Sequence, residues 1–383
     1  MSKHPVGIVM NGVTGRMGYN QHLVRSIMAI RDDGGVATPD GRQIWPEPIL
    51  VGRDAEKLQR IAKEHGLDRW TTSLDEALAF DDAEIYFDSL VTTRREDTIR
   101  AAIAAGKHVY TEKPLAGSLD GALTLARLAA NAQLKTGVVQ DKLFLPGMRK
   151  LARLVDTGFF GRLLSVRGEF GYWVFEGGSQ PSQRPSWNYR LEDGGGIILD
   201  MFCHWRYVLD NLFGPVRAVQ ALGVTHIPER VGEDGNVYRA TADDAAYAIF
   251  EIEGGVIAQV NSSWAVRVNR DELVEFQVDG TDGSAVAGLH GCKVQHKAMT
   301  PRAVWNPDLP SAADYRSGWA AVPDNMNFGN AFRVQWELFL RHVVCGEAFP
   351  WDFLAGARGV QLAALGLQSW REGRRLEVAE LTL

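Results

Sequence analysis

Short apolar runs alternate with stretches of helical apolar spacing through the first 142 residues. The runs predict strands at 6–10, 48–53, 84–90, 108–113 and 135–140. The stretches between them predict helices at 22–30, 54–66, 96–105 and 119–132. Because strands and helices alternate, the pattern indicates a Rossmann-type, doubly wound parallel sheet in an α/β fold. The segment 31–46 is interpreted as a surface loop before the second strand.

The pattern changes after residue 142. Helices are predicted at 144–158, 330–345 and 353–370, with a further apolar helix that carries Asp200 and His204. Extended runs are predicted at 163–175, 216–226, 245–253, 256–268, 273–279, 285–289 and 293–299. Short glycine turns between these runs indicate an open, mostly antiparallel sheet. We expect a nucleotide-binding domain at 1–142, a substrate and oligomerisation domain at 143–350, and a closing helix and tail at 351–383 that pack back across both.

Composition narrows the class of protein. A chain of 383 residues with 45% hydrophobic content is expected to be globular and soluble. A formal net charge of -6 without a basic stripe argues against a nucleic-acid partner, and no segment is apolar enough to span a bilayer. The cysteines, Cys203, Cys292 and Cys345, show neither CxxC spacing nor a disulfide pattern, and the N-terminus shows no signal-like stretch. A cytoplasmic location is expected.

A glycine turn is the first candidate for chemistry. The strand at 6–10 runs into Asn11-Gly12-Val13-Thr14-Gly15-Arg16-Met17-Gly18, directly before the first helix. Glycines at such a turn let the backbone approach a pyrophosphate, and the following helix N-terminus supplies free N–H groups. The spacing Gly-x-x-Gly-x-x-Gly is a variant of the commoner dinucleotide fingerprint, and its position between strand and helix gives it weight.

The end of the second strand selects the cofactor. An acidic side chain there binds the adenosine ribose hydroxyls, whereas a small residue beside an arginine accommodates a 2′-phosphate. The strand ends Gly52-Arg53-Asp54, and Gly52 and Arg53 favour NADP. Asp54 is either a helix cap or a ribose ligand, which leaves NAD open. The predicted cofactor is therefore NAD or NADP, with NADP favoured.

A lysine, an aspartate and a histidine form the second candidate group. Glu112-Lys113-Pro114 ends an apolar strand, and Gly194-Gly195-Gly196 leads into the helix of Asp200 and His204. Because Asp200 and His204 are four residues apart, they share one helix face, where the carboxylate can orient the imidazole. Hydride loss from a carbinol carbon requires removal of the hydroxyl proton, and either His204 or Lys113 is suited to take it.

An aromatic and basic loop precedes that helix. Residues 183–190 are expected to close over the substrate, because Trp and Tyr stack on sugar faces while Asn and Arg bind hydroxyls or an anionic group. The predicted substrate contacts are Lys142, Tyr172, Trp173, Arg184, Trp187, Asn188 and Tyr189. His290, Cys292 and His296 lie along a strand and its turn, and no metal site is predicted from them.

In their order and spacing, the glycine turn, Glu112-Lys113-Pro114 and the Asp200–His204 helix resemble the Gfo/Idh/MocA oxidoreductases over nearly the whole chain. The resemblance implies a Rossmann domain, a C-terminal α/β domain, and NAD(P)-linked chemistry on sugars, inositols and polyols. It implies that Lys113 binds the reacting hydroxyl, that His204 is the acid/base group and that Asp200 orients it. A homodimer or homotetramer through the outer sheet face is also implied. The implied cofactor site consists of Gly12, Thr14, Gly15, Arg16, Met17, Gly18, Gly52, Arg53, Thr92, Glu112 and Lys113.

Two stretches depart from the family pattern. Residues 92–97 replace a Thr-Pro-Asn sequence that is followed by a histidine, and Lys142 stands where an asparagine or arginine is common.

Three functions fit the residues. The favoured one is reversible, NAD(P)-dependent oxidation of a sugar, glycoside or cyclic polyol. The second is an NAD-dependent glycosidase that oxidises C3 transiently, eliminates the aglycone and re-reduces the sugar. The third is a non-catalytic nucleotide sensor. The presence of Lys113 and His204 argues against it, because a sensor does not need them.

Overall fold

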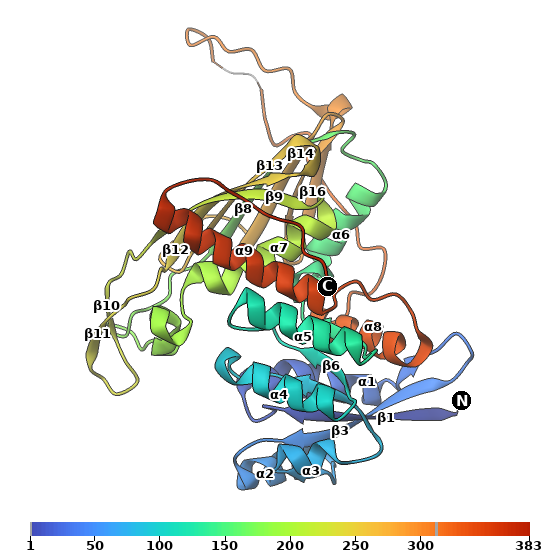
Figure 1. Ribbon diagram of the computed structural model, residues 1–383. Coiled ribbons are helices and arrows are strands. Elements are labelled where there is room, and N and C mark those ends of the chain that lie inside the picture. Colours follow the sequence, from blue (N-terminus) through green and yellow to red (C-terminus); the bar gives the residue numbers. More distant parts are fainter. Residues whose placement is uncertain (1, 311–312) are drawn as a thin grey trace. The chain divides into compact units, whose positions relative to one another are not determined.

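The strands expected in the first 142 residues form one twisted sheet. A computed structural model describes residues 2–310 and 313–383 (Figure 1). The strands of this sheet are β1 (Lys3–Asn11), β2 (Val36–Ala37), β3 (Gln43–Val51), β4 (Trp70–Thr71), β5 (Ala83–Asp88), β6 (His108–Thr111) and β7 (Thr136–Val138). Their order is β2-β3-β1-β5-β6-β7 with β4 paired to β3, and only β2 is antiparallel to its neighbour. The predicted doubly wound fold is confirmed.

Helices connect these strands. They are η1 (Met17–Met28), α1 (Ala29–Asp32), α2 (Ala55–His65), α3 (Leu74–Leu78), α4 (Thr92–Ala104), α5 (Leu119–Asn131) and the short 3₁₀ turn η2 (Asp141–Phe144). η1 is a π-helix, and it begins at Met17, before the start of the helix predicted at 22–30. Its buried residues include His22, Leu23 and Ile27, and intervals of four or five residues fit one face of either helix type, so the pattern does not separate them.

The segment 31–46 is more ordered than the surface loop predicted for it. Val36 in β2 pairs with Ile44 of β3, and β3 begins at Gln43 rather than at residue 48. Prolines are depleted in strands, so Pro46 and Pro48 weaken the strand signal of the early part of β3 in the sequence. The segment therefore lengthens the second long strand and adds a short antiparallel edge.

The two faces of this sheet bury different sets of side chains. Ile8 and Met10 of β1 pack with residues of η1, α2 and α8 (Ala331–Cys345). Val9 points to the opposite face, where residues of α3, α4, α5 and the start of α9 (Phe353–Glu372) complete a second core. Successive side chains of β1 thus point to opposite faces and contribute to both cores, as expected for a parallel sheet covered on both sides.

A second sheet is built by the later strands. These are β8 (Leu163–Gly171), β9 (Val216–Val224), β12 (Ala245–Ile252), β13 (Val256–Ser263), β14 (Val274–Gly280), β15 (Gly283–Gly288), β16 (Cys292–His296), β17 (Ala320–Ala321) and β18 (Leu376–Glu377). Their order is β17-β16-β15-β14-β8-β13-β12-β9-β18, and β8 with β13 is the single parallel pairing among them. The predicted open, mostly antiparallel sheet is confirmed.

Shorter elements surround this sheet. The helices are α6 (Pro146–Asp156) and α7 (Ile197–Leu212), and α7 packs on β9, β12 and β13. The 3₁₀ turns are η3 (Ser186–Tyr189), η4 (Leu191–Asp193), η5 (Glu253–Gly255) and η6 (Lys297–Met299). A separate hairpin joins β10 (Glu229–Val231) to β11 (Val237–Arg239). Among the described residues, no helix has the length and apolar content needed to cross a membrane.

The chain packs as two compact units. The first comprises residues 1–144, 329–364 and 380–383, and the second comprises residues 145–328 and 365–379. Helix α8 and the first part of α9 therefore belong to the unit with the parallel sheet. The functional division at 142/143 and 350/351 stays a prediction.

Candidate functional site

The carboxyl ends of the parallel strands carry the first group of predicted residues. The neighbouring strands β1, β5 and β6 end at Asn11, Asp88 and Thr111. The glycine turn directly follows β1, and Glu112 and Lys113 directly follow β6. In doubly wound folds a dinucleotide binds at this edge of the sheet.

The glycine turn is packed in a way that only glycine permits. Gly12 has a φ of 84°, in the left-handed region. A Cβ added to Gly18 would lie 2.5 Å from Ser89 Oγ and 2.6 Å from the Gly12 carbonyl oxygen. Gly15 N donates to Gly12 O at 2.9 Å, and η1 begins at Met17. This backbone cradle at a helix N-terminus fits the pyrophosphate of NAD or NADP.

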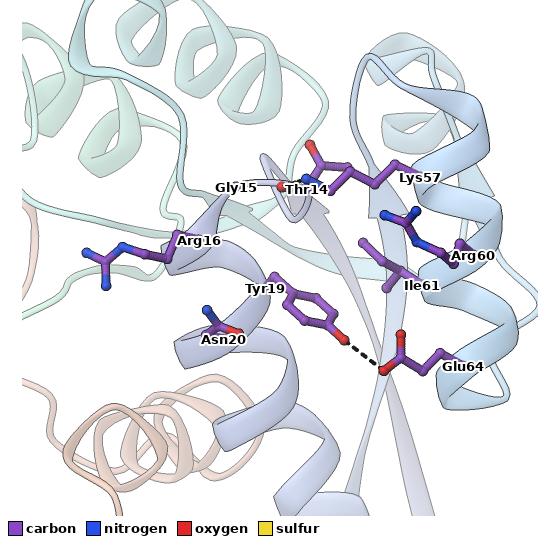
Figure 2. Close-up of a pocket in the computed structure, with 9 residues that line it drawn as sticks. All are labelled: Thr14, Gly15, Arg16, Tyr19, Asn20, Lys57, Arg60, Ile61 and Glu64. Carbon is purple, nitrogen blue, oxygen red and sulfur yellow. Dashed lines mark hydrogen bonds between the residues drawn. The ribbon is translucent and has the colours of Figure 1, made fainter. Parts of the chain in front are cut away.

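A pocket of about 380 Å³ lies beside the turn, between η1 and α2 (Figure 2). Lys57 Nζ donates a hydrogen bond to the Thr14 carbonyl oxygen at 2.6 Å, and Tyr19 Oη donates to Glu64 Oε1 at 3.2 Å. Figure 2 shows Arg16 extended away from α2. The residues that line the pocket are Thr14, Gly15, Arg16, Tyr19, Asn20, Lys57, Arg60, Ile61 and Glu64.

At the end of β3, Asp54 has the helix-cap role that the sequence suggested, while its role as a ribose ligand stays a prediction. Its carboxylate accepts a hydrogen bond from Lys57 N at 2.9 Å and so caps α2. Arg53 is exposed, and a Cβ on Gly52 would lie 3.0 Å from Thr14 Cγ2. The small residue and the exposed arginine keep the arrangement that suits a 2′-phosphate. Thr92 is the first residue of α4.

The main chain at Lys113 is held from two directions. Glu112 Oε2 accepts the Lys113 N–H at 3.2 Å, and the Arg95 guanidinium donates to the Pro114 carbonyl oxygen. Arg95 is itself fixed by Asp88, with Nε 3.1 Å from Oδ1, and both side chains are almost completely buried. Nothing in the sequence pattern marks Arg95, because its partners come from separate strands and loops. Figure 1 shows β6 next to the helices that cover this sheet.

Glu112 is a buried carboxylate with a histidine partner. His22 Nε2 lies 2.8 Å from Glu112 Oε1. Burial acts to raise the pKa of Glu112, but the hydrogen bond from His22 outweighs it together with the nearby positive charges, and the pKa is lowered. In the sequence His22 is one more position on the buried face of a helix, whereas the structure gives it a polar contact.

Residues from elsewhere in the second unit fix the start of α7. Ile197 N donates to the Asp243 carbonyl oxygen at 3.0 Å, and Ile198 N donates to Asp243 Oδ2 at 2.8 Å. Gly196 has a φ of 117°, and a Cβ added to Gly195 would lie 2.4 Å from the Trp187 carbonyl oxygen. The glycine run therefore lets the chain pass close to its neighbours before it enters the helix.

Asp200 and His204 lie on α7 as predicted, each with a contact that the sequence pattern does not show. His204 is buried, and its Nδ1 lies 2.6 Å from Tyr207 Oη, one turn further along. Arg184 Nη2 lies 3.4 Å from Asp200 Oδ2. The i, i+3 spacing of His204 and Tyr207 is the only sequence signal for that pair. The orientation of His204 by Asp200 stays a prediction.

The predicted substrate loop divides into exposed and buried side chains. Trp187 is 48% exposed, whereas Tyr189 is buried with the Arg230 guanidinium 3.6 Å from its ring centroid. Asn188 is also buried, and its Nδ2 donates to the Pro185 carbonyl oxygen at 2.9 Å. Arg184 stacks on Trp264 at 4.2 Å. Of the predicted contacts in this loop, Trp187 and Arg184 keep accessible surface, and their contact with a substrate stays a prediction.

The remaining predicted residues are distributed over both units. Lys142 lies in η2 of the first unit, 3.9 Å from Asp141 Oδ2. Tyr172 and Trp173 are partly buried in the second unit, and Arg267 lies 4.0 Å from the Trp173 ring centroid. Lys113 belongs to the first unit, and Asp200 and His204 belong to the second. Their joint action in one site stays a prediction.

The stretch with His290, Cys292 and His296 contains no metal-ligand cluster in the part of the chain that the structure describes. Cys292 is buried on β16, and burial raises the pKa of its thiol to about 11. His296 Nδ1 accepts a hydrogen bond from Ala298 N at 3.2 Å.

Two protein-family models match the chain. One is described as an oxidoreductase family with an NAD-binding Rossmann fold and matches residues 7–140. The other is the GFO/IDH/MocA C-terminal domain and matches residues 148–286. Together they cover the parallel sheet and most of the antiparallel sheet.

Curated relatives match over most of the chain. D-xylose dehydrogenase of Paenarthrobacter nicotinovorans is 56% identical over 382 residues, which cover 99% of this chain and 98% of that protein. 1,5-anhydro-D-fructose reductase of Ensifer adhaerens is 28% identical, with 83% of this chain and 88% of that protein covered. Among solved structures, the apo form of levoglucosan dehydrogenase has a TM-score of 0.81 at 19% sequence identity, with 100% of both chains covered. At that identity the likeness establishes the fold.

Proposed function

The chain belongs to the GFO/IDH/MocA family and is an oxidoreductase that uses NAD or NADP, and within that class we propose that it oxidises a ring carbinol of a sugar. The observation that carries the proposal is the anchoring of Lys113. The Lys113 N–H donates to Glu112, and Arg95 donates to the carbonyl oxygen of the next residue, Pro114, at the edge of the sheet where the glycine turn lies. A lysine fixed there can place its side chain reproducibly against a hydroxyl group.

The substrate class is supported by the relatives. The protein that shares 56% identity is named a D-xylose dehydrogenase, and a D-xylose 1-dehydrogenase of Haloferax volcanii is 24% identical over 78% of this chain. We therefore propose an aldose such as D-xylose as the substrate. The NAD-dependent glycosidase alternative has no comparable support among the named relatives.

The chemistry divides between cofactor and protein. A nicotinamide cofactor held at the glycine turn would supply the hydride acceptor for the carbinol carbon, and the hydroxyl proton would go separately to a base of the protein. Lys113 donates a hydrogen bond to that hydroxyl oxygen, and Lys113 or His204 accepts the proton. Asp200 stabilises the positive charge that His204 gains. Trp187 and Arg184 bind the sugar face and its hydroxyls.

Preference for NADP is part of the proposal. Arg53 is exposed beside Gly52, Asp54 is engaged as a helix cap, and Lys57 and Arg60 add positive charge to the neighbouring pocket. This arrangement favours a 2′-phosphate over ribose hydroxyls.

A homo-oligomer is also proposed, through the face of the antiparallel sheet that α7 does not cover. Tyr247 and Ile249 of β12 are 41% and 47% exposed, and Tyr247 is paired across the strands with Leu222, which is 58% exposed. Ile257 on β13 extends the same apolar surface. Contiguous exposed apolar side chains of this kind favour contact with a second protein surface.

The test is a sugar panel with both cofactors. D-xylose, other aldoses, cyclic polyols and 4-nitrophenyl β-D-xyloside are incubated with NAD or NADP, while reduced nicotinamide and free nitrophenol are followed. We expect D-xylose to yield reduced nicotinamide, and Lys113→Met to reduce this rate at least about 10³-fold with cofactor affinity little changed. Release of nitrophenol without accumulation of reduced nicotinamide would establish the glycosidase instead.

A further inference from the structure

A buried chain of polar contacts leads from α8 to Lys113. Trp336 Nε1 donates to His22 Nδ1 at 3.0 Å, and His22 Nε2 contacts Glu112 Oε1 at 2.8 Å. The second oxygen of Glu112 accepts the Lys113 N–H. Trp336 and His22 are 0% exposed and Glu112 is 7% exposed, and all four residues belong to the first unit.

The direction of each hydrogen bond follows from the donors available. The indole Nε1–H of Trp336 can only donate, so His22 Nδ1 accepts and the His22 proton on Nε2 points at Glu112. The Trp336 indole therefore selects the histidine tautomer. A carboxylate that accepts from His22 and from a backbone N–H is stabilised in its ionised form.

Surrounding contacts restrain both Trp336 and His22. Gln335, next to Trp336, accepts from Gln140 N at 2.8 Å and donates to the Val138 carbonyl oxygen at 3.1 Å, so α8 is fastened to the end of β7. The His22 ring lies 4.3 Å from the Phe87 ring and 5.2 Å from the Phe332 ring, measured between centroids. Packing on both sides leaves His22 little freedom to turn.

The polar and charged groups around Glu112 come from three elements. His22 faces it from η1, and Arg95 of α4 lowers its pKa while paired with Asp88. Lys113 is its neighbour along the chain and lowers the pKa as well. On β6, burial raises the pKa of Tyr110, and Glu112 and then Asp141 of η2 raise it further. Lys113 and Arg95 are thus the two cations that lower the pKa of Glu112.

We propose that His22 is a positioning residue for the reaction: held in one tautomer by Trp336, it keeps the Glu112 carboxylate ionised, and Glu112 in turn fixes the charge and the main-chain direction at Lys113. This inference rests on the role of Lys113 in the proposed function. A lysine beside a fixed anion keeps its proton until substrate and oxidised nicotinamide supply competing charge. Loss of the anion makes the lysine give up its proton at lower pH.

The 383-residue protein without cofactor or sugar gives the first test. Trace acetic anhydride labelling, followed by mass spectrometry, measures the pH at which Lys113 becomes half-reactive. We expect His22→Leu to lower this pH by ~0.5 unit or more, since Glu112 then lacks the hydrogen bond that holds its carboxylate beside Lys113. Glu112→Gln, an isosteric neutral replacement, is expected to cause a shift of the same sign.

Two further variants separate this effect from loss of packing. His22→Gln keeps a donor toward Glu112 and is expected to restore the wild-type value to within about 0.2 unit. Phe332→Leu removes a ring that packs on His22 but no hydrogen bond, and it is expected to leave the value unchanged. An unshifted His22→Leu protein, or an equal shift in Phe332→Leu, would overturn the proposal. If His22→Leu does not fold, His22→Phe replaces it as the variant without a donor toward Glu112.

The pH profile of kcat/KM gives the second test in an active enzyme. The limb on which the rate falls toward acid is expected to move to lower pH in His22→Leu and to return in His22→Gln. The labelling assay needs neither sugar nor cofactor, so its result can be interpreted even if no sugar in the panel is oxidised. A positive panel with an unshifted Lys113 would refute the His22 role alone.

Discussion

The Asp243 carboxylate accepts the backbone N–H of Ile198 at 2.8 Å, although the two residues are 45 positions apart in the chain. It thereby caps the helix that carries Asp200 and His204. Its Oδ1 atom is buried without a hydrogen-bond partner among the described residues, and burial raises the pKa of this carboxyl to about 6. Because the Asp243 carboxyl caps α7 and its pKa is raised in the folded protein, the stability of the protein depends on pH.

Asp243 is expected to make the protein less stable as the pH rises from about 4 to 7. The ordinary pKa of an aspartate is 3.8 and the folded value is about 6, so the unfolded chain ionises first and the folded state loses stability between these two pH values, with little further change above them. The contribution amounts to ~3 kcal/mol at most. Urea titrations at several pH values should show this slope, and Asp243→Asn should flatten it. An identical slope in the variant would contradict the assignment.

Arg184→Met should affect the sugar more than the cofactor. The guanidinium stacks on Trp264 and pairs with Asp200, all within the second unit. We expect kcat/KM for the sugar to fall about tenfold or more, with the KM for the cofactor within about twofold of wild type. Arg184→Lys keeps the charge without the planar stack and should be intermediate. A change confined to the cofactor KM would place Arg184 elsewhere in the reaction.

Arg53→Ala should discriminate between the two cofactors. If Arg53 binds the 2′-phosphate, the KM for NADP rises about tenfold or more while the KM for NAD changes little. Arg60→Ala is the matched control, because Arg60 lines the pocket beside α2. Equal effects of Arg53→Ala on both cofactors would show that this arginine does not bind the phosphate. A larger NADP effect in Arg60→Ala would assign that role to the pocket.

Ile249→Asp should dissociate the proposed oligomer. A buried charge without a partner is costly at an apolar interface, so the variant is expected to sediment as a smaller species than wild type. Val237→Asp, on the β10–β11 hairpin, changes a side chain that is 69% exposed and lies outside the proposed surface. It should leave the sedimentation unchanged. A monomeric wild-type protein would refute the oligomer directly.

Local signals in the sequence predicted much of the cofactor-binding unit. Asp54 caps α2 and Gly66 ends it, because capping depends on residues within a few positions of each other. The glycine turn follows β1 where a parallel strand must end. Strand β3 was predicted too short because prolines are depleted in strands, and the apolar spacing predicted the first helix without distinguishing its π type.

The sequence by itself determined the alternation of strands and helices, the glycine turn, and the positions of Lys113, Asp200 and His204, since these are properties of short segments. Only the tertiary structure placed His22 on Glu112, Arg95 on the Pro114 carbonyl and Asp243 at the start of α7. Each of these pairs joins residues far apart in the chain, and each satisfies a buried polar group that would otherwise be costly. Such partners are chosen by packing and burial, which no local spacing in the sequence encodes.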